Sequence, residues 1–177
     1  MYIPERVAGG ELLRLLTHPF VHVSGYHFLL DGAAFILLYN QLSQRSLRRR
    51  LAALLVIHAA VTFAVTLSLP FMPVDTYGGL SGIAHGLMAL CGLEMTVHRD
   101  RAIRQAGGLC FAIVLIKSFA EALTGGALFG SLHLGSVGVP IVWAHLGGVM
   151  GALFVFVVWQ AETAKSREGA GMKQSAA

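Results

Sequence analysis

The chain has 177 residues, of which 55% are hydrophobic and 12% are charged, about half the charged fraction of an average soluble domain. With a mean hydropathy of +0.68, this composition excludes a disordered chain and argues against a soluble globular domain. The isoelectric point of about 9.4 suggests nucleic-acid binding, unless the basic residues are placed for another reason.

Five segments are apolar enough to be transmembrane helices, each of which needs about 20 apolar residues. In chain order they cover about residues 21–42, 51–69, 80–97, 107–123 and 139–160. We therefore expect an all-α polytopic membrane protein. One membrane domain covers residues 1–160, and a polar cytoplasmic tail covers residues 161–177.

The basic residues are distributed unequally between the two ends of these spans. Ten of the 13 Lys and Arg residues follow the first, third or fifth span. Only Arg6 and Arg14 lie at the other ends, and Lys117 lies within a span. By the positive-inside rule, the side with ten basic residues is cytoplasmic. The high isoelectric point therefore reflects membrane topology, and we expect no nucleic-acid partner.

Polar side chains gather near the outer ends of the first, third and fifth spans. Such groups are costly in lipid, so they are usually functional or they pair helices. They include His27 and Asp31 of the first span, Ser81 and His85 of the third, and His145 of the fifth.

Ser81 lies in a glycine-rich run at a transition from a loop to a helix. Glycines allow a substrate to approach closely, and a helix N-terminus offers free N–H groups to an oxyanion. These features suit a nucleophile. Alternatively, Gly78, Gly82 and Gly86 form a ladder of small residues for helix packing.

His145 lies near the outer end of the fifth span, about one helical turn from the depth of Ser81. Histidine is the usual base that activates a serine. We predict a Ser81–His145 dyad, because no acidic residue is easily placed as a third member. His85 shares a helix face with Ser81, and it stacks on His145, forms a hydrogen bond with it, or competes with it as the base.

Two further pairs have the i, i+4 spacing that places both side chains on one helix face. His27 is a candidate oxyanion donor, whereas Asp31 donates only when protonated and otherwise partners a nearby histidine or Lys117. Lys117 and Glu121 favour a structural ion pair over a proton relay. We expect His58, in the second span, to form a hydrogen bond across helices.

Together these residues resemble the rhomboid intramembrane serine proteases over about residues 10–155. Residues 79–82, Gly-Leu-Ser-Gly, match the family's G-x-S-G nucleophile motif. Residues 144–148, Ala-His-Leu-Gly-Gly, match its A-H-x-x-G base motif, and residues 17–31 resemble its second transmembrane helix. The resemblance implies a nucleophile at Ser81, a base at His145 and a rhomboid-like helical bundle. It also implies an oxyanion hole formed by the Ser81 N–H with His27 and the residue at position 31, here Asp31. Gly79 and His85 are expected to support the site.

The string G-x-S-G-x-x-H-G and the Lys117/Glu121 pair are typical of one branch, the rhombosortases. That branch implies a secreted, membrane-anchored substrate with a Gly-Gly-containing motif, a C-terminal apolar helix and basic residues. Cleavage releases the substrate from its anchor. The resemblance implies a bacterial inner membrane protein with an active site that faces outward, and it implies no metal or cofactor.

Two features depart from the family pattern. Most rhomboids carry Asn at the position of Asp31. Residues 1–6 resemble the middle of the family's first outer loop, so we expect its first helix to be missing, through a fragment or a start assigned too late. These departures leave open a non-catalytic, rhomboid-like protein that captures transmembrane segments. A transporter or proton channel, with flux that depends on Lys117 and Glu121, is a third alternative.

Overall fold

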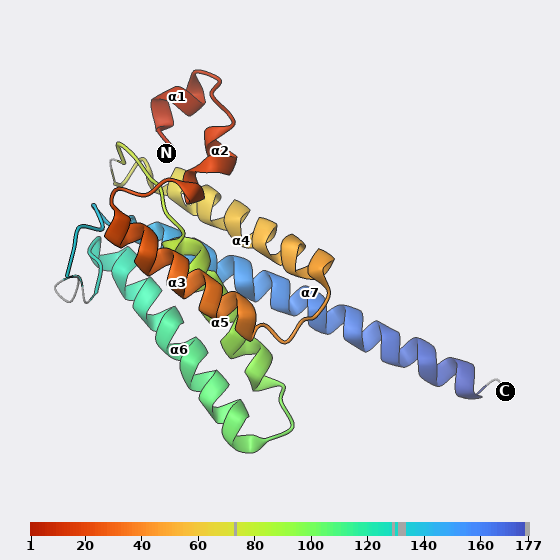
Figure 1. The fold of residues 1–177 in the computed structure, drawn as a ribbon. Coiled ribbons are helices and arrows are strands. Elements are labelled where there is room, and N and C mark those ends of the chain that lie inside the picture. Colours follow the sequence, from red (N-terminus) through yellow and green to blue (C-terminus); the bar gives the residue numbers. More distant parts are fainter. Residues whose placement is uncertain (73, 129, 131–133, 176–177) are drawn as a thin grey trace.

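The computed structural model describes every residue except 73, 129, 131–133 and 176–177, and its described part is a bundle of helices without a strand (Figure 1). Three short helical segments precede the bundle: α1 (Pro4–Ala8), α2 (Arg14–Thr17) and the 3₁₀ turn η1 (His18–Phe20). Five long helices follow: α3 (Gly25–Gln41), α4 (Leu47–Ser68), α5 (Ser81–Thr96), α6 (Arg101–Thr124) and α7 (Val142–Ser175). The predicted all-helical architecture is confirmed.

Each predicted span overlaps a long helix, but α3 and α7 begin at Gly25 and Val142, later than the predicted starts near residues 21 and 139. The helices also differ in length. Three segments are long and apolar enough to cross a membrane by themselves, namely α4, α6 and Val142–Ser166 of α7. A fourth span is possible if Arg14–Phe20 and Gly25–Gln41, which meet at 95°, count as one. α5 has only 16 residues, or about 24 Å at 1.5 Å per residue, against a hydrocarbon core of about 30 Å.

α5 begins one residue after the predicted start of the third span at residue 80, because the backbone of the preceding loop is not helical. Gly79 has a φ of +102°, in the left-handed region that glycine adopts most readily. The predicted third span over residues 80–97 is therefore slightly too long, and Ser81 is the first residue of α5.

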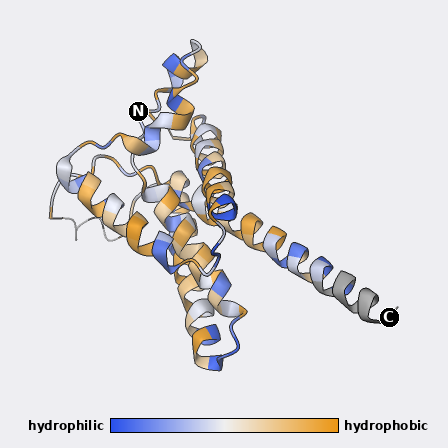
Figure 2. Ribbon diagram, turned by 45° about the vertical axis from the view of Figure 1, so that its right-hand side comes forward, coloured by the Kyte–Doolittle hydropathy of each residue, from blue (hydrophilic) through white to orange (hydrophobic). Residues whose placement is uncertain are grey.

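α5 is the central helix, and it packs mainly against α7 and α6. Nine of its 16 residues are buried. α3 shows the opposite pattern, because its only buried residues are polar, His27 and Asp31. Several of its large apolar side chains, such as Phe28 and Leu37, are exposed, whereas Phe35 and Leu38 are partly buried against the core. Figure 2 shows hydrophobic residues dominating the long helices, as expected for a bundle surrounded by lipid.

Glycines bring the backbones of α5 and α7 into direct contact. A Cβ atom added at Gly148 would overlap the carbonyl oxygen of Gly82. One added at Gly86 would lie 2.7 Å from the Gly148 oxygen, and one at Gly82 would lie 2.9 Å from the Ala144 oxygen. The predicted packing role is therefore confirmed for Gly82 and Gly86, whereas Gly78 lies in the preceding loop.

α7 continues beyond the predicted end of the fifth span near residue 160, and it projects past the other helices (Figure 1). Residues 161–175 contain no proline and several good helix formers, which explains the continuation. An ion pair of 3.1 Å between Arg49 and Glu162 connects this part of α7 to α4. The boundary predicted at residue 160 therefore falls inside a helix.

We predict that Gly148→Ala destabilises the protein, because the new methyl group has no space between α5 and α7. Overpacking of this kind costs about 1–3 kcal/mol. Gly108→Ala on α6 is the matched control, since nothing lies within 4 Å of a Cβ atom added there. Thermal unfolding of the purified variants in detergent tests this prediction. Equal melting temperatures would contradict the close packing of α5 and α7.

Candidate active site

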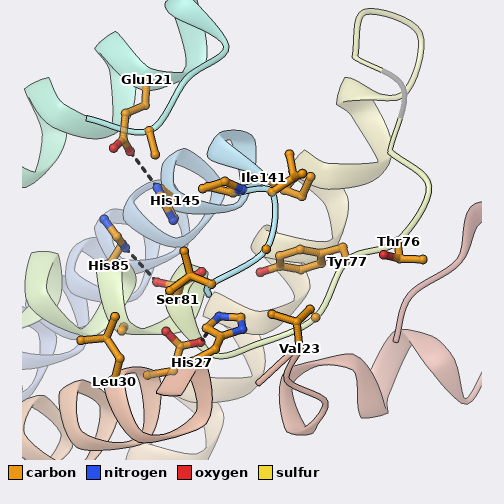
Figure 3. Close-up of a pocket in the computed structure, with 18 of the residues that line it drawn as sticks. Val23, His27, Leu30, Thr76, Tyr77, Ser81, His85, Glu121, Ile141 and His145 are labelled. Carbon is orange, nitrogen blue, oxygen red and sulfur yellow. Dashed lines mark hydrogen bonds and ion pairs between the residues drawn. The ribbon is translucent and has the colours of Figure 1, made fainter. Parts of the chain in front are cut away.

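One cavity collects the polar side chains of four helices (Figure 3). Its volume is about 580 Å³. Seven residues predicted for the site or its supporting pairs line this cavity: His27, Asp31, Ser81, His85, Lys117, Glu121 and His145. Segments that are distant in the sequence are thus brought to one place by the packing of α3, α6 and α7 around α5.

Ser81 is the first residue of α5, so its N–H has no acceptor within the helix. Among the described residues, this N–H has no backbone acceptor. The loop before it passes very close to α3, since a Cβ atom at Gly79 would lie 2.8 Å from Asp31 Oδ2 and 2.9 Å from His27 Nε2. Glycine at position 79 therefore meets two requirements, a positive φ and the absence of a side chain.

His145 is buried near the start of α7, and a carboxylate fixes one of its ring nitrogens. Its Nδ1 donates a hydrogen bond of 2.7 Å to Glu121 Oε2. A carboxylate only accepts, so Nδ1 carries a proton and the lone pair of the neutral ring is on Nε2. Ser81 and His145 face the same cavity (Figure 3), although the described contacts include no hydrogen bond between the Ser81 hydroxyl and His145.

His85 stacks on His145, with ring centroids 3.8 Å apart and planes inclined by 10°. This confirms the predicted stacking. His85 Nδ1 donates to the Ser81 carbonyl at 2.8 Å, and its Nε2 accepts from the Lys117 ammonium at 3.1 Å. Both ring nitrogens are therefore occupied, and His85 is a poor candidate for the base.

Glu121 is completely buried, and both of its oxygens accept hydrogen bonds. Oε1 accepts from Lys117 Nζ at 2.6 Å and from the Leu128 N–H at 2.8 Å, while Oε2 accepts from His145. The predicted Lys117–Glu121 ion pair is confirmed. The bond to His145 was not predicted, although a carboxylate near the outer end of the fourth span is a signal that could have suggested it.

His85, Glu121 and His145 could together offer ligands to a metal ion, because their ligand atoms lie within 4.8 Å of one another. However, the Lys117 ammonium already donates to both His85 and Glu121. A divalent cation held by these residues would have to displace that ammonium group. The Lys117 ammonium thus already provides the positive charge that a metal ion would bring to this cluster.

Asp31 acts as an acceptor in this structure. Its Oδ2 accepts from the Leu80 N–H at 2.7 Å and lies 3.1 Å from His27 Nε2 and 3.5 Å from His22 Nε2. The alternative that Asp31 partners a nearby histidine is therefore confirmed. The same carboxylate holds the loop that leads into Ser81.

The loop before α5 is also fixed from its other side by residues that the motifs do not include. The carbonyl of the buried residue His18 accepts from the Gly79 N–H at 3.2 Å, and its ring lies against Tyr77 and His58. Burial raises the pKa of the Tyr77 hydroxyl far above its usual range. His58 forms the predicted hydrogen bond between segments, with the Leu15 carbonyl at 2.8 Å.

Comparison with known proteins gives one significant match. A family model described as Rhomboid domain matches residues 9–161, which is most of the chain. No curated protein and no solved structure gives a significant match.

We predict that Asp31→Leu lowers the melting temperature, because it leaves the partly buried Leu80 N–H without its acceptor, at a cost of about 1–3 kcal/mol. Asp31→Asn is the matched control, since its amide oxygen can still accept that bond. We expect it to retain most of the lost stability. Thermal unfolding of both variants in detergent checks the prediction, and equal losses would argue against the Leu80 contact.

Proposed function

Because the chain belongs to the rhomboid family, whose members are intramembrane serine proteases, we propose that it is a serine endopeptidase with Ser81 as the nucleophile and His145 as the base. The observation that carries this proposal is the placement of both residues on one cavity, with Nδ1 of His145 bound to Glu121. This arrangement leaves Nε2 of His145 as the atom able to accept a proton.

In the proposed reaction, His145 Nε2 takes the proton of the Ser81 hydroxyl as the oxygen attacks the scissile carbonyl. The carbonyl oxygen becomes an oxyanion, which the Ser81 N–H and the His27 ring stabilise. His145 then returns the proton to the leaving amine. Water hydrolyses the acyl-enzyme in a second, similar cycle.

The substrate we propose is a secreted protein held in the membrane by a C-terminal apolar helix that follows a Gly-Gly motif. Glycine reduces the cost of unwinding the peptide so that its scissile carbonyl is exposed. The shortness of α5 supports cleavage within the membrane. If its cytoplasmic end is level with the membrane edge, Ser81 lies about 6 Å below the opposite edge, from the rise per residue and the usual core thickness.

The distribution of Lys and Arg supports an orientation with the cavity toward the outer face of a bacterial inner membrane. Glu94, near the cytoplasmic end of α5 in this orientation, accepts the backbone N–H groups of Ser43 and Gln44. These two residues directly precede Arg45 and lie next to the three arginines in the first turn of α4. The cavity and the basic loops therefore lie at opposite ends of α5.

The second candidate is a non-catalytic rhomboid-like protein that binds transmembrane segments. The observation that favours it is the Asp31 carboxylate, which accepts from the Leu80 N–H and lies 3.1 Å from His27 Nε2, the proposed oxyanion donor. A carboxylate there repels a developing negative charge unless a neighbouring histidine compensates it. A protein that binds its target without cleaving it forms no oxyanion, so the charge of Asp31 would not interfere with its function.

We predict that Ser81→Ala abolishes labelling by a fluorophosphonate probe and lowers peptidase activity by roughly a million-fold, the scale seen when a serine protease loses its nucleophile. Ser118→Ala is the matched control, because the Ser118 hydroxyl is buried on α6 and lacks a partner among the described residues. Labelling retained by Ser81→Ala would reject the mechanism. Absence of labelling in the native chain would favour the non-catalytic protein.

We also predict selectivity for the glycine motif. A membrane-tethered reporter whose tail contains Gly-Gly before its apolar helix should be released, and the same reporter with Val-Val should be retained. Valine has a higher helix propensity than glycine and lacks its backbone freedom, so the Val-Val segment unwinds less readily. Release is measured by immunoblotting of soluble and membrane fractions, with Ser81→Ala as the control. Equal release of both reporters would contradict the proposed substrate class.

A further inference from the structure

We propose that Glu121 is the third member of the catalytic unit, a positioning residue that selects the His145 tautomer able to accept the proton of Ser81. The proposal rests on the proposed protease function, and it gives Glu121 a role beyond its ion pair with Lys117. The sequence spacing alone predicts only that ion pair.

The geometry of the Glu121–His145 contact supports this role. The bond between Nδ1 and Oε2 is 2.7 Å long, and both side chains are buried, with 0% and 6% exposure for Glu121 and His145. A hydrogen bond to a buried carboxylate is short and strong. Because it requires a proton on Nδ1, it keeps the lone pair on Nε2, as the aspartate does in a Ser-His-Asp triad.

The carboxylate is held independently of His145. Its other oxygen accepts from Lys117 Nζ at 2.6 Å and from the Leu128 N–H at 2.8 Å. These donors lie one helical turn earlier on α6 and in the loop after it. The orientation of Glu121 is thus set before the reaction begins, which is the condition for preorganised electrostatic stabilisation.

Charge balance around the base also fits this role. Lys117 compensates the buried Glu121 carboxylate, which alone would be costly to desolvate. The same ammonium donates to Nε2 of His85, so His85 stays neutral at 3.8 Å from His145. When His145 becomes an imidazolium, Glu121 is its nearest opposite charge and the stacked ring adds no like charge.

The variant Glu121→Gln distinguishes a positioning role of Glu121 from a structural one. Glutamine has nearly the same size as glutamate and can form most of the same hydrogen bonds. Its amide oxygen can still accept from Lys117 and Leu128, which turns its NH₂ group toward His145. That group donates to Nδ1 and forces the proton onto Nε2, the wrong tautomer for taking a proton from Ser81. If Glu121 had only a structural role, the folded Glu121→Gln protein would keep its activity.

The test measures cleavage of the Gly-Gly reporter and fluorophosphonate labelling by the full chain in detergent. We expect Glu121→Gln to lower kcat by about 10³–10⁴-fold with little change in KM, as for a triad that holds the wrong tautomer. Glu121→Asp, which keeps a carboxylate, should recover part of the activity. Glu94→Gln is the matched control, because Glu94 also accepts two backbone N–H groups but lies far from the cavity lining. It should retain full activity.

A second readout does not depend on turnover. NMR of ¹⁵N-labelled histidine should show His145 protonated at Nδ1 in the native chain and at Nε2 in Glu121→Gln, with His145→Ala identifying the signal. Native kcat in Glu121→Gln, or an unchanged tautomer, would overturn the role of Glu121. Ser81→Ala, measured in parallel, tests the proposed function separately, since activity retained there would overturn the protease mechanism itself.

Discussion

The backbone contact between α5 and α7 determines where the chemistry of this protein can take place. Gly82 and Gly148 approach so closely that neither position tolerates a side chain. Their neighbours in sequence include Ser81 at the first turn of α5, and Ala144 and His145 at the first turns of α7. A motif of small residues, which is usually a packing device in membranes, therefore also sets the serine and the histidine at one level.

The second constraint is that polar groups within an apolar bundle must satisfy one another. The two buried residues of α3, His27 and Asp31, are polar, while several of its large apolar side chains are exposed. Asp31 holds the loop before Ser81, and Glu121 holds His145. Each buried carboxylate thus orients a different part of the site. One polar layer thus both stabilises the bundle and orients the residues of the proposed active site.

The sequence predicts the parts of this structure that depend on local spacing or on a motif. It places Ser81 and His145 in a shared layer, and the i, i+4 rule predicts the Lys117–Glu121 pair that the structure contains. The contact of Glu121 with His145 depends on how α6 and α7 are rotated against each other, and no local rule provides that rotation. The helix of the fifth span continues past residue 160, because hydropathy marks the edge of a membrane and not the end of helical hydrogen bonding.

The central claim is that the cavity activates one serine, and its most direct test is to locate a covalent adduct. The native chain is treated in membranes with a fluorophosphonate and digested, and its serine-containing peptides are analysed by mass spectrometry. We predict a phosphonyl group on Ser81 and on no other serine. An adduct on a different serine, or none in a correctly folded preparation, would contradict the account.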